Sequence, residues 1–76
     1  MVYAYVMIKT GTGASEGLID DLRDLSEVVE AHIVAGEYDI ITEMDVEDVY
    51  TILHVAVSKM QGMSGVVDTR TYISLD

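Results

Sequence analysis

The sequence predicts an α+β domain in which four strands and two helices follow one another in the order β-α-β-β-α-β. Four runs are rich in β-branched and aromatic residues, and two segments between them repeat apolar residues at helical spacing. Only Gly36-Glu37 separates the second run from the third, which is typical of a hairpin. With 76 residues, the chain has room for one domain.

The first strand is expected over residues 2–10, where apolar character is nearly continuous. Val6 and Ile8 belong to one face, whereas Tyr5 and Met7 belong to the other. Neither face is typical of a solvated surface, so we expect this strand to be covered on both sides.

The first helix is expected to follow the turn at residues 11–14, with Ser15 as its N-cap. Its inner face repeats leucine and isoleucine at helical spacing, at Leu18, Ile19, Leu22 and Leu25.

The second and third strands are expected over residues 28–35 and 38–44, paired antiparallel. Asp45 is expected to cap the second helix, and Asp48 three residues later completes a start that resembles a capping box. The inner face of that helix is expected to consist of Val49, Leu53, Ala56, Val57 and Met60. Gly62 ends the helix, and the last strand covers residues 65–75.

This order is the ferredoxin-like pattern, a four-stranded antiparallel sheet with two helices on one face. The opposite face would then expose a second apolar set, which a second sheet packed about 10 Å away would cover. Cysteine is absent, so disulfides cannot supply the stability that a short chain lacks. We therefore expect a dimer.

The chain is strongly acidic, with a formal charge of −10 from 14 acidic and 4 scattered basic residues. Phosphate binding takes clustered lysine and arginine, so we expect neither direct nucleic-acid binding nor attraction to anionic membranes. Two interpretations of the acidity remain open: a solvated surface and adaptation to a high-salt cytoplasm. No run approaches the length of a membrane span and no signal peptide is evident, so a soluble cytoplasmic protein is expected.

The sequence shows no reaction signature. No serine lies in a nucleophile elbow, and the carboxylates are spread over helix exteriors. His32 and His54 are the only imidazoles. His32 alternates with Glu30 along a strand, and a structural or interface role is expected for it because no ligand partners can be placed beside it. We expect no catalytic residue, no cofactor and no metal site.

One constellation suggests a small-molecule site. Asp39 opens an otherwise apolar strand and can accept hydrogen bonds from the α-ammonium of an amino acid. Backbone N–H groups near Gly36 or Gly65, with the hydroxyls of Thr69 and Thr71, can hold a carboxylate. The alternative is an ordinary hairpin turn and an ordinary strand opening.

Three segments together resemble a known family: residues 4–10, the turn Gly36-x-Tyr38-Asp39, and Gly65-Val66-Val67-x-Thr69-x-Thr71. They are similar to the effector-binding (RAM) domain of the Lrp/AsnC transcription regulators, and the resemblance covers residues 1–76 as a single domain. It implies sheet-to-sheet dimers, assembly into octamer-like rings, and amino-acid effectors bound at contacts between dimers. The effector-binding residues that it implies are Gly36, Tyr38, Asp39, Gly65, Thr69 and Thr71.

Typical members of that family carry an N-terminal helix-turn-helix, whereas this chain begins at its first strand, so we expect a stand-alone form. Such a module would influence the transcription of amino-acid metabolism genes indirectly, by sensing an effector. Two alternatives remain open: a scaffold that co-assembles with a full-length Lrp/AsnC regulator, and a small dimeric enzyme of the oxygenase or isomerase type. A pocket between sheet and helices that holds His32 would favour the enzyme, and a pocket between subunits would favour the sensor.

Overall fold

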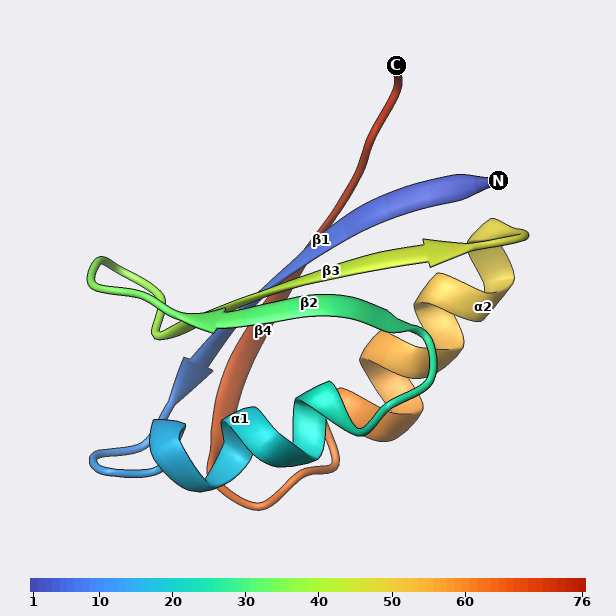
Figure 1. Ribbon diagram of the computed structural model, residues 1–76. Helices are drawn as coiled ribbons and strands as arrows, with labels where there is room; N and C mark the ends of the chain where they lie inside the picture. Colours follow the sequence, from blue (N-terminus) through green and yellow to red (C-terminus); the bar gives the residue numbers. More distant parts are fainter.

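The computed structural model describes residues 1–76, which form one antiparallel sheet with helices on one face (Figure 1). The strand order is β2-β3-β1-β4. The strands are β1 (Val2–Thr10), β2 (Val28–Ile33), β3 (Ile40–Val46) and β4 (Val66–Ile73). Helix α1 (Ser15–Arg23) follows β1, and helix α2 (Val49–His54) continues directly into the π-helical segment η1 (Val55–Met60). The predicted ferredoxin-like α+β fold is confirmed.

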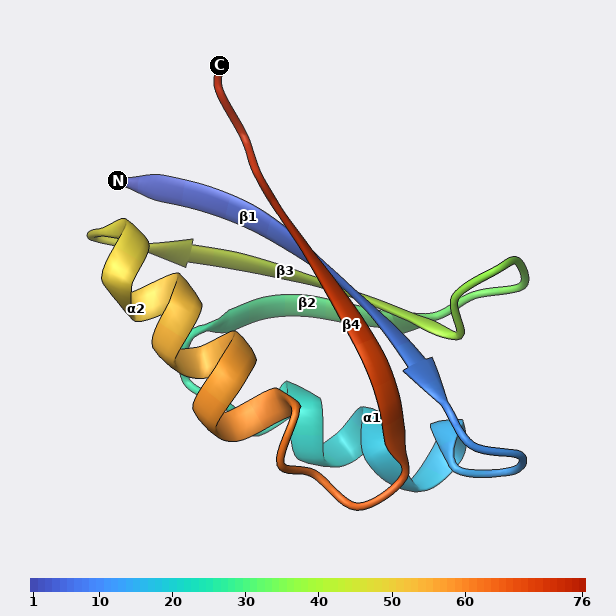
Figure 2. The same cartoon turned by 180° about the vertical axis from the view of Figure 1, so that it is seen from behind.

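The hydrophobic core lies between the sheet and the helices, which occupy the same side of the sheet in both views (Figure 2). Ala4, Val6 and Ile8 alternate along β1 and are fully buried there. The one buried polar residue, Thr42, donates its hydroxyl proton to the backbone oxygen of Val6 at 3.1 Å, so its burial leaves no unpaired donor. Neither helix is long and apolar enough to span a bilayer.

The start of α2 differs from the prediction. Its N-cap is Asp48, whose side chain accepts a hydrogen bond from the backbone N–H of Thr51 at 2.8 Å. Asp45 still belongs to β3, because that strand continues to Val46 opposite Val2. The predicted cap residue was therefore wrong, since the pairing of β1 with β3 extends the strand at the expense of the helix.

The inner face of the second helix was also predicted in part wrongly. Ala56 and Met60 are buried as expected, but Val49, Leu53 and Val57 are 41%, 46% and 56% exposed. The core instead receives Ile52 and Val55 from this segment. Apolar residues occupy both sides of the segment, so spacing alone does not decide which side faces the sheet. The π-helical turn, closed by the bond from the Gln61 N–H to the Ala56 oxygen, further shifts side chains around the axis.

Smaller differences occur at β2 and α1. The β2 strand ends at Ile33, and residues 34–39 form a longer loop than the tight link that we expected. A register shift between Val28 and Glu30 leaves Val29 57% exposed. Ser15 is the first residue of α1 rather than its cap, and its hydroxyl pairs with that of Thr10 at 2.9 Å.

Two glycines offer a matched test of backbone conformation. Gly65 has φ +96°, and a Cβ there would lie 2.9 Å from the Cβ of Ala14, so Gly65→Ala should destabilise the protein by at least about 1–2 kcal/mol. Gly17 lies in α1 with nothing within 4 Å, so Gly17→Ala should stabilise it by about 0.5–1 kcal/mol. Urea unfolding at one fixed protein concentration measures both changes, and two shifts of the same sign would contradict this account.

An ion pair ties the loop before β2 to η1. Lys59 Nζ lies 3.0 Å from Glu27 Oε2, and this hydrogen bond holds the pKa of Glu27 below its usual 4.5. A lowered pKa in the folded state means that the stabilisation is present above pH 4.5 and is lost as the pH falls through the lowered value. Glu27→Gln should therefore reduce the free energy of unfolding by about 0.2–1 kcal/mol at pH 7 and by less at pH 3. Urea unfolding at the two pH values tests this, with Glu47→Gln, an exposed glutamate without an ion pair, as the control.

Candidate functional site

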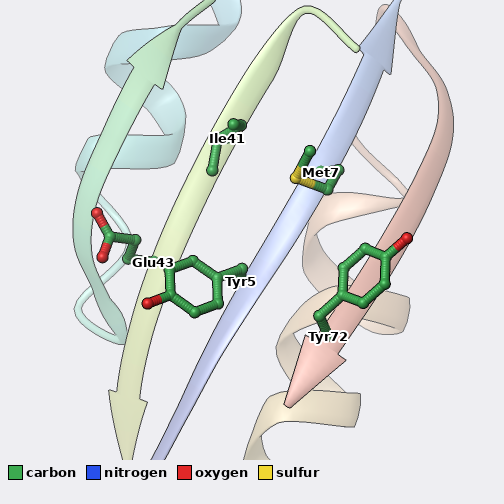
Figure 3. Close-up of a pocket in the computed structure, with 5 residues that line it drawn as sticks. All are labelled: Tyr5, Met7, Ile41, Glu43 and Tyr72. Atoms are coloured by element: carbon green, nitrogen blue, oxygen red, sulfur yellow. The ribbon is translucent and has the colours of Figure 1, made fainter. Parts of the chain in front are cut away.

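The sheet face opposite the helices is uncovered in a single chain, and it has an apolar centre surrounded by charged residues. Tyr5, Met7, Ile41 and Tyr72 point outward from three neighbouring strands and, with Glu43, line a shallow hollow of about 480 Å³ (Figure 3). Tyr5 lies opposite Glu43 on one side and opposite Tyr72 on the other, so the lining is set by strand register. Tyr72 is 54% exposed. An exposed apolar surface of this kind typically marks a binding surface.

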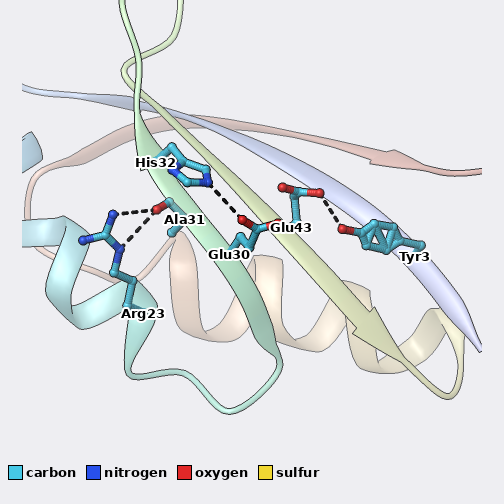
Figure 4. Close-up of polar contacts among 6 residues, drawn as sticks. All are labelled: Tyr3, Arg23, Glu30, Ala31, His32 and Glu43. Carbon is cyan, nitrogen blue, oxygen red and sulfur yellow. Dashed lines mark hydrogen bonds and ion pairs between the residues drawn. The ribbon is translucent and has the colours of Figure 1, made fainter.

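Beside the hollow, polar side chains gather where β2 meets β3 (Figure 4). His32 Nε2 lies 3.3 Å from Glu30 Oε1, and the hydroxyl of Tyr3 donates to Glu43 Oε1. The bond to Glu43 raises the pKa of Tyr3 to about 12, because it stabilises the protonated phenol. The partner of His32 is Glu30, the residue with which it alternates along β2, and the pairing of β2 with β3 adds Glu43 to the two.

Asp39, predicted to bind an effector, holds the β2–β3 loop against β1. Its Oδ2 accepts a hydrogen bond from the backbone N–H of Thr10 at 2.8 Å, and its own N–H donates to the Ile8 oxygen at 3.0 Å. The carboxylate of Asp39, just before the apolar start of β3, therefore has a structural partner in the backbone N–H of Thr10. The carboxylate is half-buried, and its other oxygen makes no hydrogen bond within the chain.

Tyr38 lies one residue before Asp39 and comes close to Arg70, a residue that sequence reasoning did not select. The phenol groups of Tyr38 and Tyr72, in that order, raise the pKa of Arg70. Arg70 lies opposite Met7, so it belongs to the open face of the sheet. The sequence did contain a sign that Arg70 lies on the open face. Arg70 stands between Thr69 and Thr71 in a strand, and alternation puts it on the other face from both threonines.

The remaining predicted residues lie on the helix side of β4 or in loops. Thr69 and Thr71 lie opposite the buried Ile8 and Val6, and Thr69 Oγ1 accepts a hydrogen bond from Gln61 Nε2 at 3.0 Å. The Gly65 oxygen accepts from the Gly11 N–H at 2.9 Å. Gly36 is exposed in the β2–β3 loop.

The six predicted residues therefore form two groups rather than one pocket within a single chain. Asp39 and Thr69 lie on either side of Ile8. The N–H of Asp39 donates to the Ile8 oxygen, and Thr69 is the partner of Ile8 in β4. Two strand spacings therefore separate Asp39 from Thr69 by roughly 10 Å. Gly36, Tyr38 and Asp39 belong to the loop group, whereas Gly65, Thr69 and Thr71 belong to the β4 group.

Comparisons with known proteins agree with this fold. A family model described as the Lrp/AsnC ligand binding domain matches residues 3–76. The crystal structure of FFRP-DM1 superposes with a TM-score of 0.93 at 28% identity, and the match covers 99% of this chain and 100% of that one. AsnC of E. coli gives a TM-score of 0.90 at 25% identity, and the match covers 99% of this chain but 51% of AsnC.

A transcriptional regulator from Neisseria meningitidis, NMB0573, solved as a complex with L-Met, shares the fold. It has a TM-score of 0.88 at 19% identity, and the match covers 99% of this chain and 50% of that one. Curated proteins gave no match. Because the family model spans almost the whole chain, this protein belongs to the Lrp/AsnC ligand-binding domain family.

Proposed function

We propose that this chain is a cytoplasmic regulatory module that oligomerises, binds an amino-acid effector at subunit interfaces, and thereby modulates transcription of amino-acid metabolism genes indirectly. The observation that carries the proposal is the match of residues 3–76 to a ligand-binding domain of transcription regulators. Family membership indicates a regulatory role rather than an enzymatic one.

The open sheet face supports self-association. Tyr5, Met7, Ile41 and Tyr72 together form an apolar surface that water contacts in a single chain. A second copy packed sheet to sheet, about 10 Å away, covers the same residues on both partners. Aromatic side chains at the centre of the surface are typical of interface cores. Dimers formed in this way are the units of the proposed ring.

The division of the predicted effector residues supports a site between subunits. The loop group offers the carboxylate of Asp39 for an ammonium group, and the β4 group offers the hydroxyls of Thr69 and Thr71 for a carboxylate. The two groups lie on separate parts of one chain, so loops from a neighbouring dimer would complete the site. The shared fold of the regulator solved with L-Met supports an amino acid as the effector class.

Co-assembly with a full-length regulator is a second candidate. AsnC carries a domain of this fold in about half of its chain, so a mixed pair can use the same sheet face. The charge of −10 argues against direct contact with nucleic-acid phosphates and leaves DNA binding to the partner. The enzyme alternative predicts a pocket between sheet and helices that holds His32. The hollow that we find lies on the other side of the sheet.

Two tyrosines separate association through the open face from general surface effects. Tyr5→Glu puts a charge into the proposed interface opposite Glu43, where burial without a partner is costly, so the dimer dissociation constant should rise at least about tenfold. Tyr50→Glu changes a tyrosine that is 84% exposed on α2 and should leave association unchanged. Light scattering over a range of protein concentrations measures both. A wild-type protein that stays monomeric and folded at micromolar concentration would refute the interface.

The effector proposal is tested at Asp39. Free amino acids are screened one at a time for a rise in melting temperature, as binding to the folded state requires. Asp39→Ala should abolish the shift produced by the best ligand. It should also reduce the free energy of unfolding by about 1.5–3 kcal/mol, because the Thr10 N–H loses a charged acceptor.

The control is Asp48→Ala, which removes another aspartate that accepts a backbone N–H at 2.8 Å, far from the predicted site. It should lower stability while keeping the ligand shift. A wild-type protein that responds to no amino acid leaves the scaffold alternative, and an Asp39→Ala variant with undiminished ligand affinity contradicts the assigned site.

A further inference from the structure

We propose that Glu30, His32 and Glu43 form a binding site for a divalent first-row transition-metal ion such as Zn²⁺. The site lies where β2 meets β3 on the open face of the sheet (Figure 4). It uses none of the predicted effector residues, so it does not depend on the proposed effector.

The backbone places the three side chains together. Glu30 and His32 are two residues apart on β2, so both point to the same face of the sheet. Glu43 of β3 lies directly opposite Glu30. One ligand atom from each of the three lies within 4.8 Å of the other two. Ligands of a tetrahedral zinc ion lie about 3.4 Å apart. The 3.3 Å between His32 and Glu30 already meets this spacing, and the other separations, all within 4.8 Å, would shorten when an ion binds.

The strand register leaves negative charge without compensation. Two carboxylates directly opposite each other in an antiparallel pair repel, and Glu30 and Glu43 occupy such a pair. No lysine or arginine neutralises them. Lys59 binds Glu27, Lys9 donates to the Glu37 backbone oxygen, and Arg23 reaches the Ala31 oxygen from α1. Arg70, the fourth, lies on β4, at the opposite edge of the sheet. A divalent ion would balance both carboxylates.

The surroundings of Glu43 favour a ligand role. The Tyr3 hydroxyl donates to Glu43 Oε1 and so orients the carboxylate, leaving Oε2 available. Hydrogen bonds of this kind from neighbouring residues hold metal ligands in position in many sites. Tyr3 itself belongs to β1, so three adjacent strands contribute to the arrangement.

The donor set decides the class of ion. Calcium and magnesium prefer oxygen ligands alone, whereas an imidazole with carboxylates suits zinc and neighbouring transition metals. Three protein ligands leave at least one coordination position for water or another donor, which is the arrangement of an open zinc site. We therefore expect zinc to bind in preference to magnesium.

The two histidines of the chain provide a matched experiment. Zinc chloride is titrated calorimetrically into the untagged full chain, in a buffer that does not bind zinc, for the wild type, His32→Ala, Glu43→Gln and His54→Ala. We expect one zinc ion per chain, a loss of affinity of at least about tenfold for the first two variants, and a change of less than about twofold for His54→Ala. Magnesium chloride at the same concentration should give no saturable binding.

A second measurement does not depend on variants. Nitrogen-15 spectra of the wild-type imidazoles should show zinc shifting the ring nitrogens of His32 and not those of His54. Equal zinc affinity for His32→Ala and the wild type, or an equal shift of both histidines, would overturn the proposal. Light scattering with and without zinc records the assembly state separately, so failure of the metal site is distinguishable from failure of the proposed dimer.

Discussion

The structure depends on a sheet that is covered on one face only. Both helices pack on the same side, and the buried residues of β1, Ala4, Val6 and Ile8, all point toward them. A domain of 76 residues buries a smaller fraction of its unfolded surface than a larger domain does, so its core contributes little stability to spare. The open face carries further apolar residues, among them Tyr5 and Met7, which a single chain leaves in contact with water. In the proposed dimer, covering them would link the stability of the fold to association.

The element order was predictable because each element has a strong local pattern. Alternation in β1 and helical spacing at Leu18 and Leu22 agree with what tertiary packing requires. The antiparallel pairing of β2 with β3 followed from their closeness in sequence, although the loop is longer than expected. Coverage of the second face of β1 stays a prediction, since it requires another chain. The family resemblance rested on short segments distributed over the whole length, and the family model confirms it.

Other features depended on contacts between distant residues and were not predictable. The face that α2 and η1 turn to the sheet could not be predicted because apolar residues surround the axis, so Leu53 was chosen where Ile52 is buried. At the predicted site, Asp39 was correctly seen as unusual, but its hydrogen bond to the Thr10 N–H depends on a residue 29 positions away. The position of Glu43 near His32 likewise follows from strand register, which single-sequence patterns do not give, whereas Glu30 is near in sequence. Whether the six predicted residues contact an effector stays a prediction.

The hollow and the polar cluster of Glu30, His32 and Glu43 are coupled because Glu43 belongs to both. A second copy that covers Tyr5 and Met7 also removes water from the vicinity of Glu43, and charged carboxylates lose favourable solvation when this happens. The repulsion between Glu30 and Glu43 then grows, because screening by water weakens. A cation bound between Glu30 and Glu43 would remove this repulsion. If the two carboxylates instead lie at the rim of the proposed interface, water continues to solvate them. In the proposed dimer, the charge on the cluster of Glu30, His32 and Glu43 would therefore influence how closely the two sheets can pack.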